Sequence, residues 1–202
     1  MTDISVIIPL APDEDSHQKL IKCIAKDMQV ITSSENARAE SLNAGALKAN
    51  GKYLWFLHAD SQINIKNIEA LKAAIKKYPD SLLYFDLAFI DAPLILKLNA
   101  FGANLRSRIF KAPFGDQGFC IKKDLFDKIG GFPVGLPYGE DHVFVWKARQ
   151  NSISINRVEE KIYTSARKYK KYGWLKTTLL HQYLWIKQAF MQWIKLMAGK
   201  NI

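Results

Sequence analysis

Short apolar runs alternate with helical segments through the first half of the chain, and this alternation is what most limits its fold. Runs rich in β-branched and aromatic residues predict buried strands at residues 4–9, 29–32, 53–57 and 82–85. Apolar spacing and helix-ending residues predict helices at about 16–26, 39–49 and 67–77. Strands that alternate with helices favour an α/β fold, with a mostly parallel sheet covered by helices on both faces.

The second half is predicted to be less regular. An apolar and basic stretch covers residues 93–114, followed by a turn at 115–118, a short strand, and helices at about 124–129 and 140–149. A last, amphipathic helix over about 172–198 places one apolar stripe along one face: Leu175, Leu179, Tyr183, Ile186, Phe190, Trp193 and Met197. No repeat or linker divides the chain, so residues 1–202 are expected to form a single domain.

Composition narrows the class of protein. The 49% of apolar and 24% of charged residues are ordinary for a globular protein and argue against disordered or fibrous classes. Cys23 and Cys120 lie far apart in apolar runs, which predicts buried free thiols and neither a disulfide nor a zinc site. The first residues lack the pattern of a signal peptide, and no apolar run is long enough to span a membrane. A cytoplasmic protein is therefore expected.

Positive charge is concentrated near the C-terminus. Residues 161–202 contain nine Lys or Arg and no Asp or Glu, which accounts for nearly all of the net charge of +10. This asymmetry indicates an acidic partner, either nucleic acid or an anionic membrane surface. No base-reading motif supports specific nucleic-acid binding. Trp174, Trp185 and Trp193 beside lysines suit a peripheral position on the inner membrane face; the alternative is that the apolar stripe packs across the domain.

Polar motifs follow the predicted strands. Ligands in mostly parallel sheets bind at the carboxyl ends of the strands, where Pro9 and Asp60 fall. Six motifs occur in order: 7–9 (IIP), 37–45 (ARAESLNAG), 56–61 (FLHADS), 115–119 (GDQGF), 130–132 (GGF) and 138–141 (YGED). Together they resemble the family-2 glycosyltransferases of the GT-A fold, particularly small bacterial members with a His-Ala-Asp-Ser or His-Ala-Asp-Thr signature. The resemblance covers about residues 4–189 and implies a three-layer α/β/α domain.

The resemblance implies an enzyme that moves a sugar from a nucleoside diphosphate donor to a hydroxyl acceptor, with inversion and with Mn²⁺ or Mg²⁺. Asp60 is implied to hold the metal, because a hard cation bound by oxygen ligands neutralises the charge of the leaving diphosphate. His58 stands where the family has its first Asp. It is expected to act either as a second metal ligand or as a donor to phosphate or ribose, and a packed histidine at a strand end is the alternative.

The Glu140-Asp141 pair resembles the Glu-Asp pair of inverting members, in which a carboxylate removes the proton of the acceptor hydroxyl. Asp141 is implied to be the base and Glu140 its partner, although these roles can be exchanged. Neighbouring acids are expected to raise the pKa of the base. The alternative is a helix N-terminus enriched in acids, which the helix dipole favours.

Seven further residues are implied to bind substrate. The nucleotide is expected near Pro9, Arg38, Asn43 and Ala59, and the sugar or acceptor near Asp116, Gln117 and Gly118. The alternatives are a surface salt bridge for Arg38 and a simple turn at 115–118. A lipid-linked acceptor would fit the basic, aromatic C-terminus.

The N-terminal half is shorter than the family pattern. Only about thirty residues separate Pro9 from the helix of Asn43, so one strand-helix unit is missing or fused, and the loop at residues 10–15 is the expected replacement source of acids. This shortening motivates a second hypothesis: a degenerate GT-A domain that binds a nucleotide or a membrane partner without catalysis.

Overall fold

The computed structural model describes residues 3–11, 16–90, 92–166 and 174–198. Six strands form one sheet in the order β2-β1-β3-β5-β4-β6. Their bounds are β1 Ile4–Pro9, β2 Gln29–Ser33, β3 Tyr53–Phe56, β4 Ser81–Phe89, β5 Phe119–Lys122 and β6 Ser154–Thr164. Only β5 runs against the other five, between β3 and β4. The prediction of a mostly parallel sheet is confirmed.

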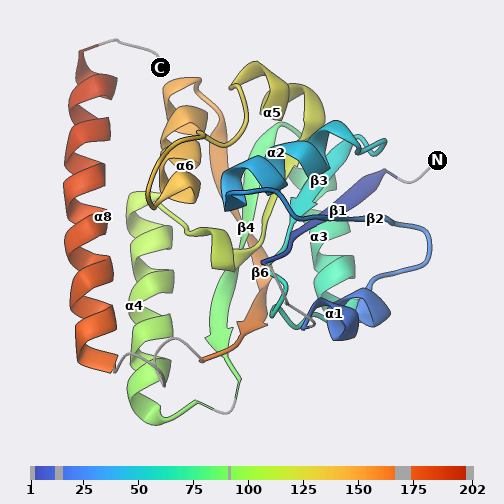
Figure 1. The fold of residues 1–202 in the computed structure, drawn as a ribbon, viewed down its shortest axis with the longest axis horizontal. Helices are drawn as coiled ribbons and strands as arrows, with labels where there is room; N and C mark the ends of the chain where they lie inside the picture. The colour runs from blue at the N-terminus through green and yellow to red at the C-terminus, as the bar shows by residue number, and fades with distance from the viewer. Residues whose placement is uncertain (1–2, 12–15, 91, 167–173, 199–202) are drawn as a thin grey trace.

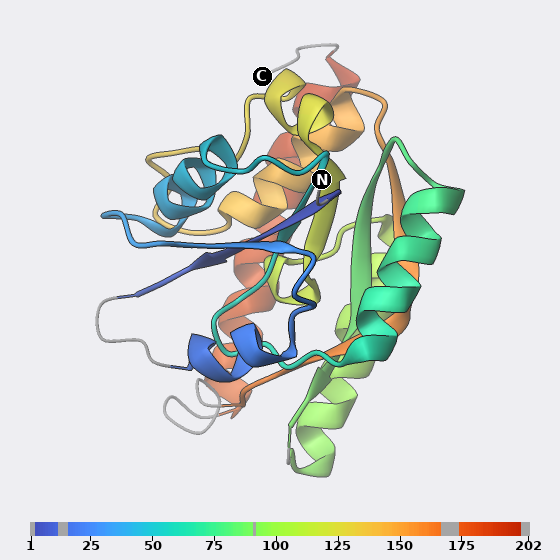
Figure 2. The same ribbon diagram turned by 90° about the vertical axis from the view of Figure 1, so that its right-hand side faces the viewer.

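Helices cover both faces of this sheet (Figures 1 and 2). Their bounds are α1 His17–Cys23, α2 Arg38–Leu47, α3 Ile65–Lys77, α4 Leu94–Phe110, the 3₁₀ turn η1 Gly115–Gln117, α5 Lys123–Lys128, α6 Glu140–Gln150 and α8 Trp174–Met197. α2, α5 and α6 contribute to the core on one face, and α1 and α3 to the core on the other. The predicted three-layer α/β/α arrangement is therefore confirmed, and α4 and α8 lie side by side at one side of it (Figure 1).

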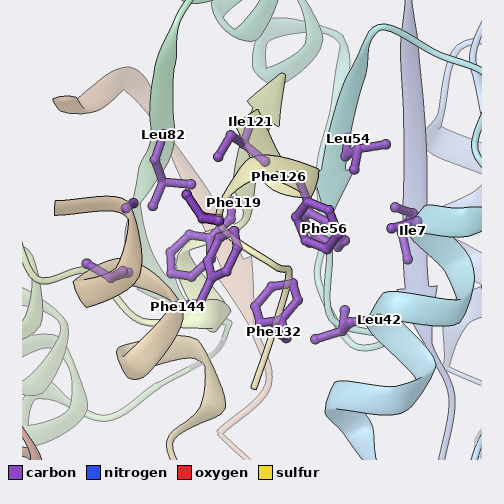
Figure 3. Packing of buried hydrophobic residues seen from close by; sticks show 14 of the residues in the cluster. Ile7, Leu42, Leu54, Phe56, Leu82, Phe119, Ile121, Phe126, Phe132 and Phe144 are labelled. Carbon is purple, nitrogen blue, oxygen red and sulfur yellow. The ribbon is translucent and has the colours of Figure 1, made fainter. Parts of the chain in front are cut away.

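Alternating strand residues supply the two cores. In β3, Phe56 faces one core and Trp55 the other. Figure 3 shows the first core, where the rings of Phe132 and Phe144 stack with centroids 4.2 Å apart. Phe144 belongs to α6 and is fully buried. Because this ring is packed among aromatic neighbours, the N-terminus of α6, with its Glu140-Asp141 pair, is held in a fixed position against the sheet.

The structure corrects several sequence predictions. Residues 93–114 contain a regular 17-residue helix, α4, and β6 was not predicted at all. α3 begins two residues earlier than expected, because the Asn64 side chain accepts a hydrogen bond from the N–H of Lys66. Cys120 is buried as predicted, but Cys23 is exposed at the end of α1. In the described part of the chain, no helix is both long and apolar enough to cross a membrane.

Candidate functional site

A cleft of about 1110 Å³ lies at the carboxyl edge of the sheet. The parallel register brings strand ends together there, since Pro9 of β1 pairs with Ser33 of β2, and Ile7 pairs with Phe56 of β3. The segments that follow these strands form one wall with the N-terminus of α6. Residues of α4 and α8 form the opposite wall. The cleft therefore lies where parallel α/β sheets bind ligands.

Arg38 is at the centre of the charged wall. Its Nη1 atom forms an ion pair with Oε1 of Glu140, and its Nη2 atom lies 2.5 Å from Nε2 of His58. Because an arginine can only donate, Nε2 of His58 must accept this hydrogen bond. One guanidinium thus joins the segment after β3 to the start of α6. Arg38 is the first residue of α2, and this position within its motif places it in the cleft lining.

Asp141 is held from two sides at the first turn of α6. Its Oδ2 atom accepts a hydrogen bond from the N–H of Gly115 at 2.6 Å, and Oδ1 accepts from the N–H of His142 at 2.8 Å. Burial alone would raise the pKa of Asp141, but the Arg38 charge and these two hydrogen bonds hold that pKa below its ordinary value. The expectation of a raised pKa is therefore wrong, and the carboxylate stays ionised at neutral pH.

Asp60 lies just past β3 and lines the cleft. Thr164, at the end of β6, donates from its hydroxyl to Oδ1 of Asp60 at 3.4 Å, a long hydrogen bond. Among the described residues, no three His, Cys, Asp or Glu side chains are grouped so as to hold a metal ion. A single carboxylate still fits a hard divalent cation whose other ligands are substrate phosphates and water, because Mg²⁺ is commonly held that way. His58 fits less well, since its Nε2 atom faces the Arg38 cation.

Three other predicted residues line the same cleft: Pro9, Ala59 and Asp116. Asn43 does not. Its side-chain amide donates to the carbonyl of Phe132 and accepts from the N–H of that residue, at 2.8 and 3.0 Å. The structure therefore does not direct Asn43 toward the predicted nucleotide contact, because both functional ends of its amide clamp the 131–132 turn against α2.

Gln117 and Gly118 were predicted to contact the sugar or acceptor, but neither lines the cleft. Gln117 is fully buried, its Oε1 atom accepts from Ser107 and Phe114, and its Nε2 atom donates to the carbonyl of Phe85. Gly118 has φ of 63° and no room for a side chain beside Ile162. Both residues shape the interior turn into β5, and of the predicted sugar contacts only Asp116 reaches the cleft.

Several residues that line the cleft were not predicted from the sequence. Glu35 and Asn36 follow β2 and line the cleft, a position that the carboxyl-edge rule would have found had β2 been followed to its end. Thr164 was missed because β6 was not predicted. The acids expected from the loop after β1 include Asp13, Glu14 and Asp15, which lie outside the described residues.

A hydrogen-bonded chain fixes the loop in front of Glu140. Nε1 of Trp146 donates to Nε2 of His142 at 3.0 Å, so Nδ1 of His142 carries the proton and faces Oε1 of Gln188 at 3.1 Å. Nε2 of Gln188 then donates to the carbonyl of Tyr138 at 2.9 Å. Burial lowers the pKa of His142, in keeping with a neutral ring. Through Gln188, α8 contacts the loop that precedes the Glu140-Asp141 pair.

Sequence and structural comparisons bear on this site. Residues 4–133 match the model of glycosyl transferase family 2. No curated protein matches the chain.

Solved structures share the fold at low identity. Residues 1–349 of S. aureus TarS superpose with a TM-score of 0.59 and 17% identity, over 81% of this chain and 60% of that one. The TarS complex with UDP-GlcNAc gives 0.56 and 16%, over 81% and 58%. GalNAc-T7 with UDP, GalNAc and Mn²⁺ gives 0.59 and 14%, over 82% and 44%. The chain thus spans less than two thirds of each of these proteins.

Proposed function

Because this chain belongs to glycosyl transferase family 2, we propose that its cleft transfers a sugar from a nucleoside diphosphate donor to an acceptor hydroxyl, with inversion at the anomeric carbon. Similar structures hold UDP-GlcNAc in TarS and UDP with Mn²⁺ in GalNAc-T7. Their likeness to this chain supports a uridine diphosphate sugar as the first donor to test. The identity of the sugar is left to that experiment.

The donor diphosphate is assigned to the strand edge. Arg38 offers a guanidinium at the N-terminus of α2, where backbone N–H groups also favour anions. Arg106, stacked on Phe114 at 3.7 Å from its ring centroid, adds a second cation to the cleft lining. Glu35 and Asn36 lie after β2, where they are placed to contact the ribose or base.

A divalent cation, Mn²⁺ or Mg²⁺, would be held by Asp60 together with the donor phosphates, and when bound it neutralises charge on the leaving diphosphate. Thr164 orients the Asp60 carboxylate through its hydroxyl. We assign His58 to Arg38 and not to the metal, because its Nε2 atom already accepts from that guanidinium. His58 thereby keeps Arg38 at the edge of the sheet.

Asp141 is assigned as the base. The acceptor oxygen forms a bond to the anomeric carbon, the bond from that carbon to the phosphate oxygen breaks, and the nucleoside diphosphate leaves with the electron pair. The hydroxyl proton goes to Asp141, whose two oxygens keep lone pairs beyond those facing Gly115 and His142. One base and direct displacement give inversion. Glu140 neutralises Arg38 and fixes the position of α6.

The observation that carries the proposal is the Arg38 network, which gathers Glu140, His58 and Asp141 in one cleft. We would first measure thermal shifts with nucleoside diphosphate sugars and Mn²⁺ or Mg²⁺, because a ligand of the folded state raises the melting temperature. Turnover of an identified donor should then fall by roughly 10² to 10⁴ in Asp141→Asn. Metal-dependent donor binding should be lost in Asp60→Ala.

Asp124→Asn is the matched control, because Asp124 is an exposed carboxylate on α5, away from the cleft. Full turnover in both cleft variants would refute the proposal. The configuration of the product distinguishes inversion from retention by the coupling constant of its anomeric proton.

A second candidate is a degenerate domain that binds a nucleotide without transfer. It is favoured by Arg38, which already contacts both Glu140 and His58 within the cleft. Calorimetry separates the two: binding of a nucleotide that is unchanged by Mn²⁺ and by Asp60→Ala, with no turnover, would support this candidate.

A further inference from the structure

The apolar stripe of α8 faces away from the protein. Tyr183 and Phe190 are 61% and 60% exposed, and the other described members of the stripe, Ile186, Trp193 and Met197, are exposed as well, as is Leu180 beside them. The side of α8 that meets the domain combines Trp185, which packs beside Phe110, with polar residues. Gln188 contacts the loop before α6, and Gln192 is buried beside Gln150 at 3.4 Å. This helix therefore has the reverse of the usual orientation, in which the apolar face meets the core.

α4 is reversed in the same way. Its large apolar residues recur at helical spacing on the exposed side, where Phe101 is 65% exposed and its companions are Leu94, Leu98, Leu105 and Ile109. Its buried side consists mainly of smaller or polar residues, among them Ala100 and Ser107. These two helices thus turn most of their large apolar side chains toward solvent, although Leu96 of α4 is buried.

The two helices are neighbours. Nδ2 of Asn99 donates to Oγ1 of Thr178 at 2.9 Å, and the rings of Phe110 and Trp185 lie 6.2 Å apart. Both contacts advance in the same chain direction, so α4 and α8 run parallel and side by side, as Figure 1 shows. Isolated exposed apolar residues need no explanation, but eleven on two adjacent helices form a surface that soluble monomers rarely leave uncovered.

The charges on these helices are of one sign. α4 and α8 contain lysines and arginines but no Asp or Glu. Lys97 and Lys187 are exposed on them, and exposed Lys111 directly follows α4. Lysines beside exposed aromatic and aliphatic residues match the boundary of an anionic bilayer, where apolar side chains enter the acyl region and ammonium groups meet lipid phosphates. A protein partner with an apolar interface would not require this uniform charge.

We propose that the outer apolar surface docks on an anionic lipid bilayer and lies in its interface. This surface is formed by Leu94, Leu98, Phe101, Leu105 and Ile109 of α4 with Leu180, Tyr183, Ile186, Phe190, Trp193 and Met197 of α8. It uses an apolar face that the tertiary structure leaves uncovered, together with an electrostatic attraction that lysines supply.

The cleft opens at the edge of this surface. Leu98 and Leu180 belong both to the outer apolar surface and to the cleft wall. A docked molecule would therefore have its cleft beside the headgroups, where a lipid-linked acceptor hydroxyl is presented. This consequence for the acceptor rests on the proposed function, whereas docking itself does not, and the following assay contains no sugar.

The test is flotation of the whole chain with phosphatidylcholine vesicles, with and without phosphatidylglycerol. Strong binding is expected only with phosphatidylglycerol. The double variant Phe101→Ser/Phe190→Ser should weaken binding roughly tenfold or more, because it removes two side chains that enter the apolar region. Lys97→Glu/Lys187→Glu should weaken binding to phosphatidylglycerol vesicles in particular.

Matched controls lie elsewhere on the molecule. Leu47→Ser replaces an exposed leucine on α2, and Lys66→Glu/Lys76→Glu reverses two exposed lysines on α3, which Figure 1 shows on the far side from α8. These variants should bind as the parent does, and unchanged circular dichroism melting verifies folding of every variant.

Three results would overturn docking: no vesicle binding by the parent chain, an equal loss in the control variants, or binding that Phe101→Ser/Phe190→Ser leaves unchanged. Sedimentation without lipid adds a further check. A stable dimer that this double variant dissociates would identify a second copy of the chain as the occupant instead, and would contradict the bilayer.

Discussion

α3 and α8 are both amphipathic, yet they attach to the domain in opposite ways. α3 turns Ile68 and Leu71 into the core and its lysines toward solvent. α8 turns Phe190 outward and contacts the domain through Trp185 and through the polar Gln188 and Gln192. Periodicity in a sequence thus identifies the two faces of a helix without saying which of them meets the protein.

The two modes of attachment have different physical consequences. Burial of apolar area holds α3, and this contribution does not depend on protonation. The middle of α8 is held by two hydrogen bonds of Gln188, which accepts from Nδ1 of His142 and donates to the carbonyl of Tyr138, and hydrogen bonds depend on geometry. Four predictions follow this contrast, from the largest effect to the smallest.

Leu71→Ala should be the most damaging, because Leu71 is 0% exposed in the core between α3 and the sheet. Loss of its side chain leaves a cavity and should lower the free energy of unfolding by about 2–5 kcal/mol. Urea denaturation measures this. Ile65→Ala on the same helix is the control, since Ile65 is exposed and should change stability by less than about 0.5 kcal/mol. Equal costs would show that α3 is not held by its inward face.

Gly139→Ala should cost about 2–3 kcal/mol. Gly139 has φ of 75°, and a methyl group there would overlap the amide of Gln188, breaking its hydrogen bonds. Gly135→Ala is a matched control with φ of 78° and open space around it, so it should show only the backbone cost of about 1–2 kcal/mol.

The double variant Gly139→Ala/Gln188→Ala separates the two contributions. It should cost less than the sum of its single variants, because the overlap disappears with the Gln188 side chain. Strict additivity in thermal denaturation would mean that α8 is not attached through Gln188.

Acidification should lower the free energy of unfolding with a smaller effect, because protonation of His142 places a second N–H against the Trp146 donor. The folded-state pKa of His142 is lowered by burial, so below its ordinary value of about 6.5 the unfolded chain takes up a proton that the folded chain does not. The free energy of unfolding should therefore fall as pH drops below about 6.5 and stop falling once pH is below the folded pKa.

The fall in the free energy of unfolding with decreasing pH should be smaller in His142→Gln, because glutamine has no ring that titrates. The Asp141 contribution, from a lowered carboxyl pKa, is lost only at pH values below about 3.8, so the two windows can be separated. An identical pH profile in parent and variant would contradict the assignment to His142.

Phe190→Ser should have almost no effect on stability. Its side chain is mostly exposed, so the free energy of unfolding in lipid-free buffer should change by less than about 0.5 kcal/mol. Chemical denaturation measures this beside Leu71→Ala. A loss of 2 kcal/mol or more would mean that the outer apolar surface packs against protein after all.

Much of the fold could be predicted from local pattern. β1, β2, β3 and α2 were placed within two or three residues, because uninterrupted apolar runs and a glycine stop are local signals. β6 was not found, because a bulge opposite Tyr84 and Asp86 breaks its alternation, so that Ile155 and Val158 are both buried at an odd spacing. α4 was missed because Gly102 and two asparagines lower its helix propensity.

The candidate site, like the fold, was only partly predicted from the sequence. Sequence motifs delivered Arg38, Asp60 and Asp141 to one cleft, because strand ends and helix starts fix where the backbone goes. They did not distinguish residues that point into the cleft from those that brace it. Asn43 and Gln117 were predicted to contact substrate, but the side-chain amide of each forms hydrogen bonds with backbone groups or neighbouring side chains.

The sequence by itself determined the alternating strands and helices, the family and the carboxylates at the strand edge, because these depend on neighbours along the chain. Only the tertiary structure decided that Arg38 holds Glu140 and His58 together, that the pKa of Asp141 is lowered, and that α8 turns its apolar stripe outward. Each of those outcomes depends on partners far away in sequence, whose positions are set by packing around the sheet.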